Sequence, residues 1–349
     1  MAANGTRSAL ILGVTGQDGS HLAADLLSQG YAVYGGYRRG HSSKLWRLEE
    51  LKILDRVQLI NVNVNEPHQV LEALTTLKPA EVYHLAGESF VADSFEQPRS
   101  VIEANVIGAL NVLEAIRIVA PGTRLFYAAS AEMFGASLDG RLLDEMSPFR
   151  PTNPYGISKL AGHQLVGMYR ERHKIHAVCG IMFNHEGPLR ARNFVTRKIT
   201  YNLARLKLAG GKPMQLGALT SARDWGFAAD YAALMPRLLA LDTLDDFVVA
   251  TGEKTTVKEF VSLAAHAAGF DPVFEGDGAS TTCRDRKSGL PLVEVSAKYF
   301  RPFDTPPLIG NPAKVKAATG FKGSRDVGAI AEAMIAADIL RRKNGMTHV

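Results

Sequence analysis

The first half of the chain alternates short β-branched apolar runs with longer amphipathic stretches, and this alternation constrains the fold more than any other feature. The order is typical of βαβ units, in which helices join parallel strands and cover both faces of one sheet. The predicted strands are residues 9–13, 32–36, 57–62, 81–85, 124–128 and 177–181. The predicted helices include residues 21–29, 70–77, 101–119 and 155–173. The sequence therefore predicts an α/β fold with a doubly wound parallel sheet of the Rossmann type.

The pattern becomes irregular after about residue 183. The elements expected there are a loop at 184–192, a helix near 195–209, a strand at 247–250, a helix at 257–268 and a polar loop at 276–289. We expect residues 1–183 to form the larger domain, with some later segments returning to it, and residues 184–349 to form mainly a smaller C-terminal lobe. A chain of 349 residues, 46% of them apolar, is long enough to bury the cores of both.

Charge and cysteine usage exclude several classes of protein. Lys and Arg are spread along the chain, so the net charge of +5 does not predict a nucleic-acid-binding arm. The same charge suits a small anionic ligand, although an ordinary solvated surface would also carry it. Cys179 and Cys283 lack ligand-spaced partners, which predicts neither a disulfide nor a metal site and fits the cytoplasm. No run is long enough to predict a membrane span or a signal sequence.

A glycine-rich turn follows the first predicted strand and precedes the first predicted helix. Glycines permit a tight turn and a close backbone approach, and the N-terminus of a helix attracts phosphate. The position predicts a dinucleotide pyrophosphate site, with a purely structural turn as the alternative. The residues expected to form it are Gly13, Thr15, Gly16, Gln17, Asp18 and Gly19.

Two arginines stand at the end of the second predicted strand. A site for NAD usually has an Asp or Glu about 20 residues after the glycines, where it holds the ribose hydroxyls. Here the strand ends in Tyr37-Arg38-Arg39 instead. Because guanidinium groups suit a 2′-phosphate, Arg38 and Arg39 predict NADP as the cofactor. Residues 1–183 are then the NADP-binding domain. The alternative is that both arginines are only solvated charges in a loop.

Tyr155 and Lys159 lie one turn apart on one face of a predicted helix, in which Pro154 takes the first position. A nearby ammonium group favours the ionised phenol. Lowering a tyrosine pKa from about 10 to about 7 requires roughly 4 kcal/mol of differential stabilisation. We therefore expect Tyr155 to act as an acid and base near neutral pH, with Lys159 tuning it. The same spacing also recurs on ordinary helix surfaces.

Ser130 and Glu132 follow the strand predicted at 124–128. The carboxyl ends of parallel strands present ligand-binding residues, so both side chains are expected to reach the site. The Ser130 hydroxyl can hydrogen-bond a reacting hydroxyl. Either residue could instead serve only as a cap, but the order of all four groups after a glycine turn favours a catalytic site made of Ser130, Glu132, Tyr155 and Lys159.

Beyond these patterns, the chain resembles the extended short-chain dehydrogenases/reductases, and most closely the GDP-mannose 4,6-dehydratase family, over about residues 7–336. The strings that carry the resemblance are TGQDGSHLA at 15–23, WRL at 46–48, EVYHLAGESFV at 81–91, PFRPTNPYGISKL at 148–160, FNHEGPL at 183–189, FVTRKIT at 194–200, RDWGFAADY at 223–231 and KYFRP at 298–302. The later strings are far more specific than the glycine turn.

The resemblance implies an internal redox reaction on a GDP-sugar. The sugar C4 is oxidised by NADP, water is lost across C5 and C6, and the hydride returns to C6. By this resemblance Tyr155 takes the C4 hydroxyl proton, Lys159 also holds the nicotinamide ribose, and Glu132 is the base at C5. Because a ketone at C4 acidifies the C5 hydrogen, an ordinary carboxylate suffices as that base.

The resemblance also implies further contacts. Those with the cofactor are Asn63 and Val64 at the adenine end and Leu85, Ala86 and Gly87 after the fourth strand. Those with the substrate are Ser89, Ser130, Asn184, Glu186, Lys198, Arg223, Arg301 and Asp304. Arg223 could instead pair with a neighbouring aspartate.

This sequence departs from the family pattern at several pocket positions. At position 131 these dehydratases usually have a Ser, and glucose-nucleotide dehydratases have an Asp that acts as the acid, but this chain has Ala131. Because Ala cannot donate a proton, Glu132 or a water must protonate the leaving C6 hydroxyl. Gly87-Glu88 replaces a small residue followed by Gln, and Gly187 replaces a Ser. Asn63-Val64 replaces an Asp followed by Leu or Met. These differences leave open a close analogue such as a GDP-manno-heptose.

Two other functions compete with this interpretation. A sugar-nucleotide epimerase or 4-keto reductase would keep Tyr155 and Lys159 but has no need of Glu132. A dinucleotide-sensing or RNA- or protein-binding module on the same fold would have lost the catalytic groups, whereas Ser130, Tyr155 and Lys159 are all present. The predicted helices at 101–119 and 155–173 resemble the pair that joins subunits in this superfamily, and the loop at 38–47 one that reaches a neighbour. We therefore expect a homodimer or homotetramer.

Overall fold

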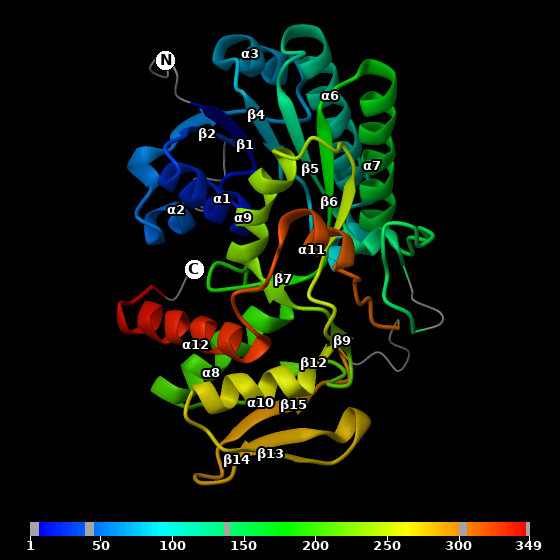
Figure 1. Ribbon diagram of the computed structural model, residues 1–349. Helices are drawn as coiled ribbons and strands as arrows, with labels where there is room; N and C mark the ends of the chain where they lie inside the picture. Colours follow the sequence, from blue (N-terminus) through cyan, green and yellow to red (C-terminus); the bar gives the residue numbers. More distant parts are fainter. Residues whose placement is uncertain (1–6, 39–44, 136–139, 300–305, 347–349) are drawn as a thin grey trace.

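A seven-stranded parallel sheet forms the larger part of the molecule (Figure 1). The structure, a computed structural model, describes residues 7–38, 45–135, 140–299 and 306–346. The strand order is β11-β6-β5-β4-β1-β2-β3. The strands are β1 (Ser8–Leu12), β2 (Ala32–Tyr37), β3 (Gln58–Asn61), β4 (Glu81–His84), β5 (Arg124–Ser130), β6 (Ala177–Met182) and β11 (Asp246–Val249). The order and the parallel pairing confirm the predicted Rossmann-type sheet.

Helices cover both faces of this sheet, and each face has its own apolar core. On one face pack α3 (Pro67–Leu77), α6 (Gly108–Val119) and α7 (Pro154–His173). On the other pack α1 (Gln17–Ser28), α9 (Ala228–Leu239) and α11 (Ala313–Thr319). Since α9, β11 and α11 come from the second half of the chain, later segments do return to the sheet, as expected. The division at residue 183 itself stays a prediction.

A third apolar core lies below the sheet in Figure 1. It is formed by α8 (Val195–Ala209), α10 (Val257–Ala267) and α12 (Val327–Lys343), packed with a four-stranded sheet. That sheet has the order β13-β14-β15-β8, with β8 (Met214–Leu216), β13 (Pro272–Glu275), β14 (Thr282–Asp285) and β15 (Pro291–Val295). Among the described residues, no helix has the length and apolar character needed to cross a bilayer.

The remaining elements are short. Near the main sheet lie α2 (Trp46–Glu50), α4 (Val91–Glu96), α5 (Pro98–Ile102) and the 3-10 turns Leu54–Arg56 and Ala131–Met133. Two small strand pairs join β7 (His185–Glu186) to β10 (Gly226–Phe227) and β9 (Ala222–Arg223) to β12 (Thr255–Thr256). A further 3-10 turn spans Gly278–Ser280.

Three predicted elements differ in the structure, and one is the loop expected at 184–192, which contains the short strand β7. The helix expected at 101–119 is interrupted by a π-helical turn, Glu103–Ile107, which lies between α5 and α6. That turn brings Asn105 inward, where its amide donates to Glu88 O and Ser158 Oγ. The loop expected at 276–289 contains β14, because Cys283 packs into the third core and alternates with exposed neighbours. Cys283 is the one apolar residue in β14, and a single apolar residue among polar ones is too weak a pattern to predict a strand.

Candidate active site

A pocket of about 780 Å³ lies at the carboxyl edge of the main sheet. It is lined at the ends of β1, β2, β4 and β5 and by the segment 182–194. The cofactor residues expected from the sequence that line it are Gly13, Thr15, Gly16, Gln17, Asp18, Gly19, Arg38, Asn63, Val64, Leu85, Ala86 and Gly87. Ser89, Ser130, Glu132, Tyr155, Lys159 and Asn184 line the same pocket. The structure thus brings most of the predicted site together.

The glycine-rich turn presents bare backbone to this pocket. Gly13 has φ +92°, and a Cβ there would lie 2.8 Å from the backbone nitrogen of Ala86. A Cβ on Gly19 would lie 2.4 Å from the carbonyl oxygen of Gly13. Helix α1 begins immediately after Gly16, which aims its first backbone N–H groups toward the turn. A dinucleotide pyrophosphate requires these same conditions, so the residues present fit such a cofactor.

Tyr155 and Lys159 lie in the first turns of α7, and Ser130 at the end of β5 lines the same pocket. Pro154 occupies the first turn, where a missing N–H is harmless. Burial raises the pKa of Tyr155 to about 12, although the Ser130 side chain opposes the rise. The protein alone therefore favours the protonated phenol, unlike the lowered pKa expected from the sequence.

Lys159 is buried beneath Tyr155. Burial lowers the pKa of the Lys159 ammonium group to about 8, and its Nζ donates to Ala128 O at 2.8 Å. Nζ lies 6.0 Å from the Tyr155 ring centroid.

Glu132 enters the pocket from the 3-10 turn that follows β5. Its backbone N–H donates to Ser130 Oγ at 3.2 Å, which fixes the turn. Its side-chain Oε2 accepts from Asn153 Nδ2 at 2.8 Å. The Glu132 carboxylate and the Tyr155 phenol both line this pocket, and the carboxylate acts on the phenol electrostatically.

The predicted substrate residues outside the pocket lining lie in three settings. Glu186 is buried, and its carboxylate accepts a hydrogen bond from Thr196 Oγ1 and forms an ion pair with Arg190. In the structure, Glu186 therefore holds the Arg190 side chain. Lys198 is half-buried, with Nζ 4.4 Å from the Tyr299 ring centroid. Arg223 donates to its neighbour's carbonyl from β9. Arg39, Arg301 and Asp304 lie outside the described residues.

Several residues that shape this pocket were not predicted from the sequence. Arg47 is buried and joins the glycine turn to the substrate side, since it donates to Thr15 O at 3.0 Å and to Leu189 O at 2.7 Å. Arg190 stacks on the Phe194 ring at 3.6 Å, and both residues line the pocket. No local pattern marks these two arginines. Asn153, a helix cap directly before a proline, could have been found from the sequence.

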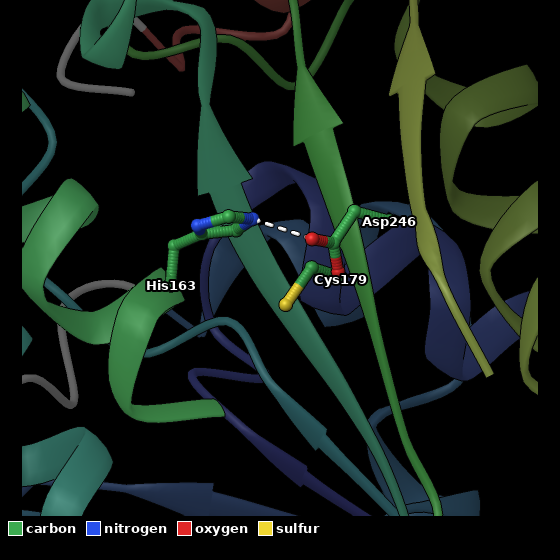
Figure 2. Close-up of side chains that lie close together, drawn as sticks. All are labelled: His163, Cys179 and Asp246. Carbon is green, nitrogen blue, oxygen red and sulfur yellow. Dashed lines mark hydrogen bonds and ion pairs between the residues drawn. The ribbon is translucent and has the colours of Figure 1, made fainter. Parts of the chain in front are cut away.

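A second group of polar side chains lies away from the pocket, at His163, Cys179 and Asp246 (Figure 2). Their ligand-type atoms lie within 4.8 Å of one another. However, Asp246 binds His163 Nε2 through one oxygen and Arg170 through the other, while burial raises the pKa of the Cys179 thiol well above its usual range. The group is better described as an ion-pair network that ties α7 to β11 than as a cation site.

The fold and the grouping of a glycine turn with Ser130, Tyr155 and Lys159 define an extended short-chain dehydrogenase/reductase. The family described as GDP-mannose 4,6 dehydratase matches residues 10–334, and this chain belongs to that family. A Caenorhabditis elegans protein named GDP-mannose 4,6 dehydratase 2 is 38% identical and covers 95% of this chain and 88% of that protein. A Yersinia enterocolitica GDP-mannose 4,6-dehydratase is 35% identical over 97% of this chain and 95% of its own. The solved structure of RMD from Pseudomonas aeruginosa complexed with NADPH, at 22% identity, has the same fold, with a TM-score of 0.76 over 96% of this chain and 100% of that one.

Proposed function

We propose that this protein converts GDP-mannose to GDP-4-keto-6-deoxymannose with NADP as its resident cofactor. The observation that carries this function is the position of Glu132, which lies in the same pocket as Tyr155, Ser130 and Lys159. An epimerase or a 4-keto reductase needs no carboxylate there. The relatives named above carry the activity of that name at 35–38% identity.

The residues proposed to hold the cofactor are those that the glycine turn and the strand ends bring to the pocket. Gly13, Gly16 and Gly19 leave room for a close approach of the pyrophosphate, and the first backbone N–H groups of α1 are proposed to bind it. Arg38, which lines the pocket, is proposed to bind the 2′-phosphate, and the same role is proposed for Arg39. NADP, when bound, accepts a hydride from the sugar C4 and returns one to C6.

The protein's own groups move the protons. Tyr155 takes the proton of the C4 hydroxyl, while Ser130, which lines the same pocket, orients that hydroxyl. Glu132 then removes the C5 proton, which the neighbouring ketone has made acidic. Asn184 lines the pocket beside these groups. For the nucleoside diphosphate we propose Asn184, Lys198, Arg223 and Arg301, with Asp304 on the guanine side and Ser89 near the sugar.

The test uses purified protein with catalytic NADP and GDP-mannose in deuterated water. We expect a product one water lighter by mass spectrometry, with deuterium at C5 and no net change in nicotinamide absorbance. The product should vanish in Glu132→Gln and Tyr155→Phe. Water loss from a GDP-manno-heptose but not from GDP-mannose would keep the reaction and change the sugar, whereas no turnover of either would refute the dehydratase.

We also propose that two copies of the chain associate through α6 and α7. Four of their side chains are large, apolar and 42–56% exposed: Ile107 just before α6, Ile118, Ile157 and Met168. Each helix carries a pair eleven residues apart, about three turns, so each pair lies on one helix face. A second copy would bury these faces. The cytoplasmic location remains a prediction, with Cys179 and Cys283 both free and buried.

A further inference from the structure

The side chain of Asn153 connects the carboxylate of Glu132 to the helix that carries Tyr155. Asn153 is 6% exposed and uses both ends of its amide. Its Nδ2 donates to Glu132 Oε2 at 2.8 Å, and its Oδ1 accepts from Gly156 N at 2.8 Å. Because a backbone N–H can only donate, the Gly156 bond fixes the amide orientation and leaves the NH₂ group facing Glu132.

The Gly156 hydrogen bond makes Asn153 the N-cap of α7. The turn that carries Glu132 and the start of α7 are also in close contact, because a Cβ on Gly156 would lie 2.5 Å from the carbonyl oxygen of Glu132. Asn153 therefore joins two segments that already touch. The relative position of Glu132 and Tyr155 depends on this junction.

The other consequence concerns the two oxygens of the carboxylate. Among the residues that the structure describes, Asn153 is the one side chain that hydrogen-bonds Glu132, and it does so through Oε2. The remaining oxygen, Oε1, is then the one left to meet substrate in the pocket. An amide NH₂ group donates without giving up its proton, so Oε2 stays engaged whether Oε1 is ionised or protonated.

The use of one oxygen of the Glu132 carboxylate matters because Ala131 cannot donate a proton to the leaving C6 hydroxyl. In the elimination, the C5–H bond breaks and its proton passes to the carboxylate. The electron pair of the broken C5–H bond forms the C5–C6 double bond while the C6–O bond breaks. The carboxylate passes the same proton to the leaving C6 hydroxyl, which departs as water. One carboxylate oxygen must then reach both C5 and the C6 hydroxyl in turn, which requires a fixed carboxylate orientation.

We propose that Asn153 is a positioning residue that holds Glu132 Oε2, so that Oε1 alone takes the C5 proton and delivers it to the leaving C6 hydroxyl. The proposal rests on the dehydratase function proposed above. It assigns to Asn153 a role beyond helix capping, and the two roles can be separated by substitution.

Three variants separate them. Asn153→Ser keeps a good N-cap but is too short to reach Glu132. Asn153→Asp keeps the cap and places a second carboxylate against Glu132, so the two share a proton until higher pH. Asp326→Ala is the matched control: Asp326 caps α12 through Ala329 N at 2.8 Å, so this variant loses a cap of the same kind in a helix outside the pocket lining.

The measurements are kcat and KM for GDP-mannose over pH, the thermal midpoint, and deuterium exchange at C5 of GDP-4-keto-6-deoxymannose by NMR. The exchange needs only the carboxylate and no hydride transfer. We expect Asn153→Ser to slow C5 exchange and kcat together by about tenfold or more, with KM and thermal midpoint unchanged. We expect Asn153→Asp to move the acid limb of the kcat profile to higher pH. Asp326→Ala should lower the thermal midpoint alone.

The outcomes distinguish the two proposals. If the unmodified protein does not convert GDP-mannose, the proposed function fails. If it does, and Asn153→Ser exchanges C5 at the unmodified rate, or loses activity only in proportion to a lowered thermal midpoint, the role of Asn153 is capping alone and the inference is wrong. An Asn153→Asp profile with an unmoved acid limb would contradict it as well.

Discussion

His185 Nε2 lies 3.0 Å from Asp18 Oδ2 and joins the glycine-rich turn to the start of the segment that leads into the smaller core. His185 Nδ1 meets Phe183 O at 2.6 Å, and Gln17 Nε2 donates to His185 O at 3.1 Å. Burial alone would lower the pKa of His185, but the charge and hydrogen bond of Asp18 outweigh it and raise the pKa above its usual value. The two halves of the pocket are therefore linked by an ion pair whose histidine loses its charge at higher pH.

This pair predicts a pH-dependent stability. Since the folded pKa of His185 exceeds the unfolded value of about 6.5, its contribution is complete below pH 6.5 or so and is lost as pH rises through the folded pKa. His185→Asn should lower the free energy of unfolding by about 1–3 kcal/mol near pH 6, less than a wholly buried pair because Asp18 is 28% exposed. Urea unfolding of both proteins at pH 6 and pH 9 measures the loss in free energy of unfolding caused by His185→Asn, and that loss should be smaller at pH 9. His68→Asn, at an exposed position, controls for replacing a histidine; an undiminished deficit at pH 9 would refute the assignment.

Lys159 predicts a pH dependence in a different range. Burial lowers its pKa from 10.5 to about 8, so between these values the unfolded chain binds a proton that the folded protein has released. Stability should therefore rise with pH across that range, by up to about 3 kcal/mol. Lys159→Met removes this rise. Between pH 8 and pH 10.5, the free energy of unfolding of the unmodified protein should therefore increase relative to that of Lys159→Met. Lys316→Met, on the exposed surface of α11, is the control. Parallel curves for the unmodified protein and Lys159→Met would exclude a buried, ionisable Lys159.

The glycine turn can be tested with a matched pair of glycines. Gly13 and Gly30 both have positive φ, +92° and +83°, but a Cβ on Gly13 would lie 2.8 Å from Ala86 N, whereas a Cβ on Gly30 has nothing within 4 Å. Both alanine variants should lose about 1–2 kcal/mol of stability to the positive-φ backbone, and Gly13→Ala should lose more because its Cβ also crowds Ala86 N. Only Gly13→Ala should also weaken NADP binding, at least tenfold by calorimetry, because it pushes the turn away from β4. Equal NADP affinities for the two variants would show that the close approach at Gly13 does not shape the cofactor site.

The parallel sheet and the catalytic group were predictable because they depend on local patterns. Apolar runs, the glycine turn and the Tyr155–Lys159 spacing are each readable within a few residues, and the chain order of parallel strands brings their ends to one edge. Most of the predicted cofactor residues do line one pocket. The cap at Asn153 belongs to the same group, since a polar residue before Pro154 marks a helix start.

What could not be predicted depends on contacts between distant segments. Arg47 meets Leu189, 142 residues away, and nothing near either residue indicates the pair. The π-helical turn brings Asn105 inward to Ser158, 53 residues away, and a helical apolar pattern cannot show such a contact. The pKa of Tyr155 was expected to fall because sequence spacing gives proximity to Lys159 but not the depth of burial, which dominates.

The proposed dimer gives the last prediction. Ile118 is 56% exposed and Ile157 50% exposed, so about half of each residue already faces solvent within one subunit, and replacing either with Asp should leave the monomer folded. In a dimer formed by α6 and α7 the charge would be buried without a partner, which costs several kcal/mol. Ile118→Asp with Ile157→Asp should therefore sediment as a monomer where the unmodified protein sediments as a dimer or tetramer. Leu340→Asp, 59% exposed on α12 at the opposite end of the molecule (Figure 1), should leave the oligomer intact. If the double variant sediments like the unmodified protein, association uses another surface.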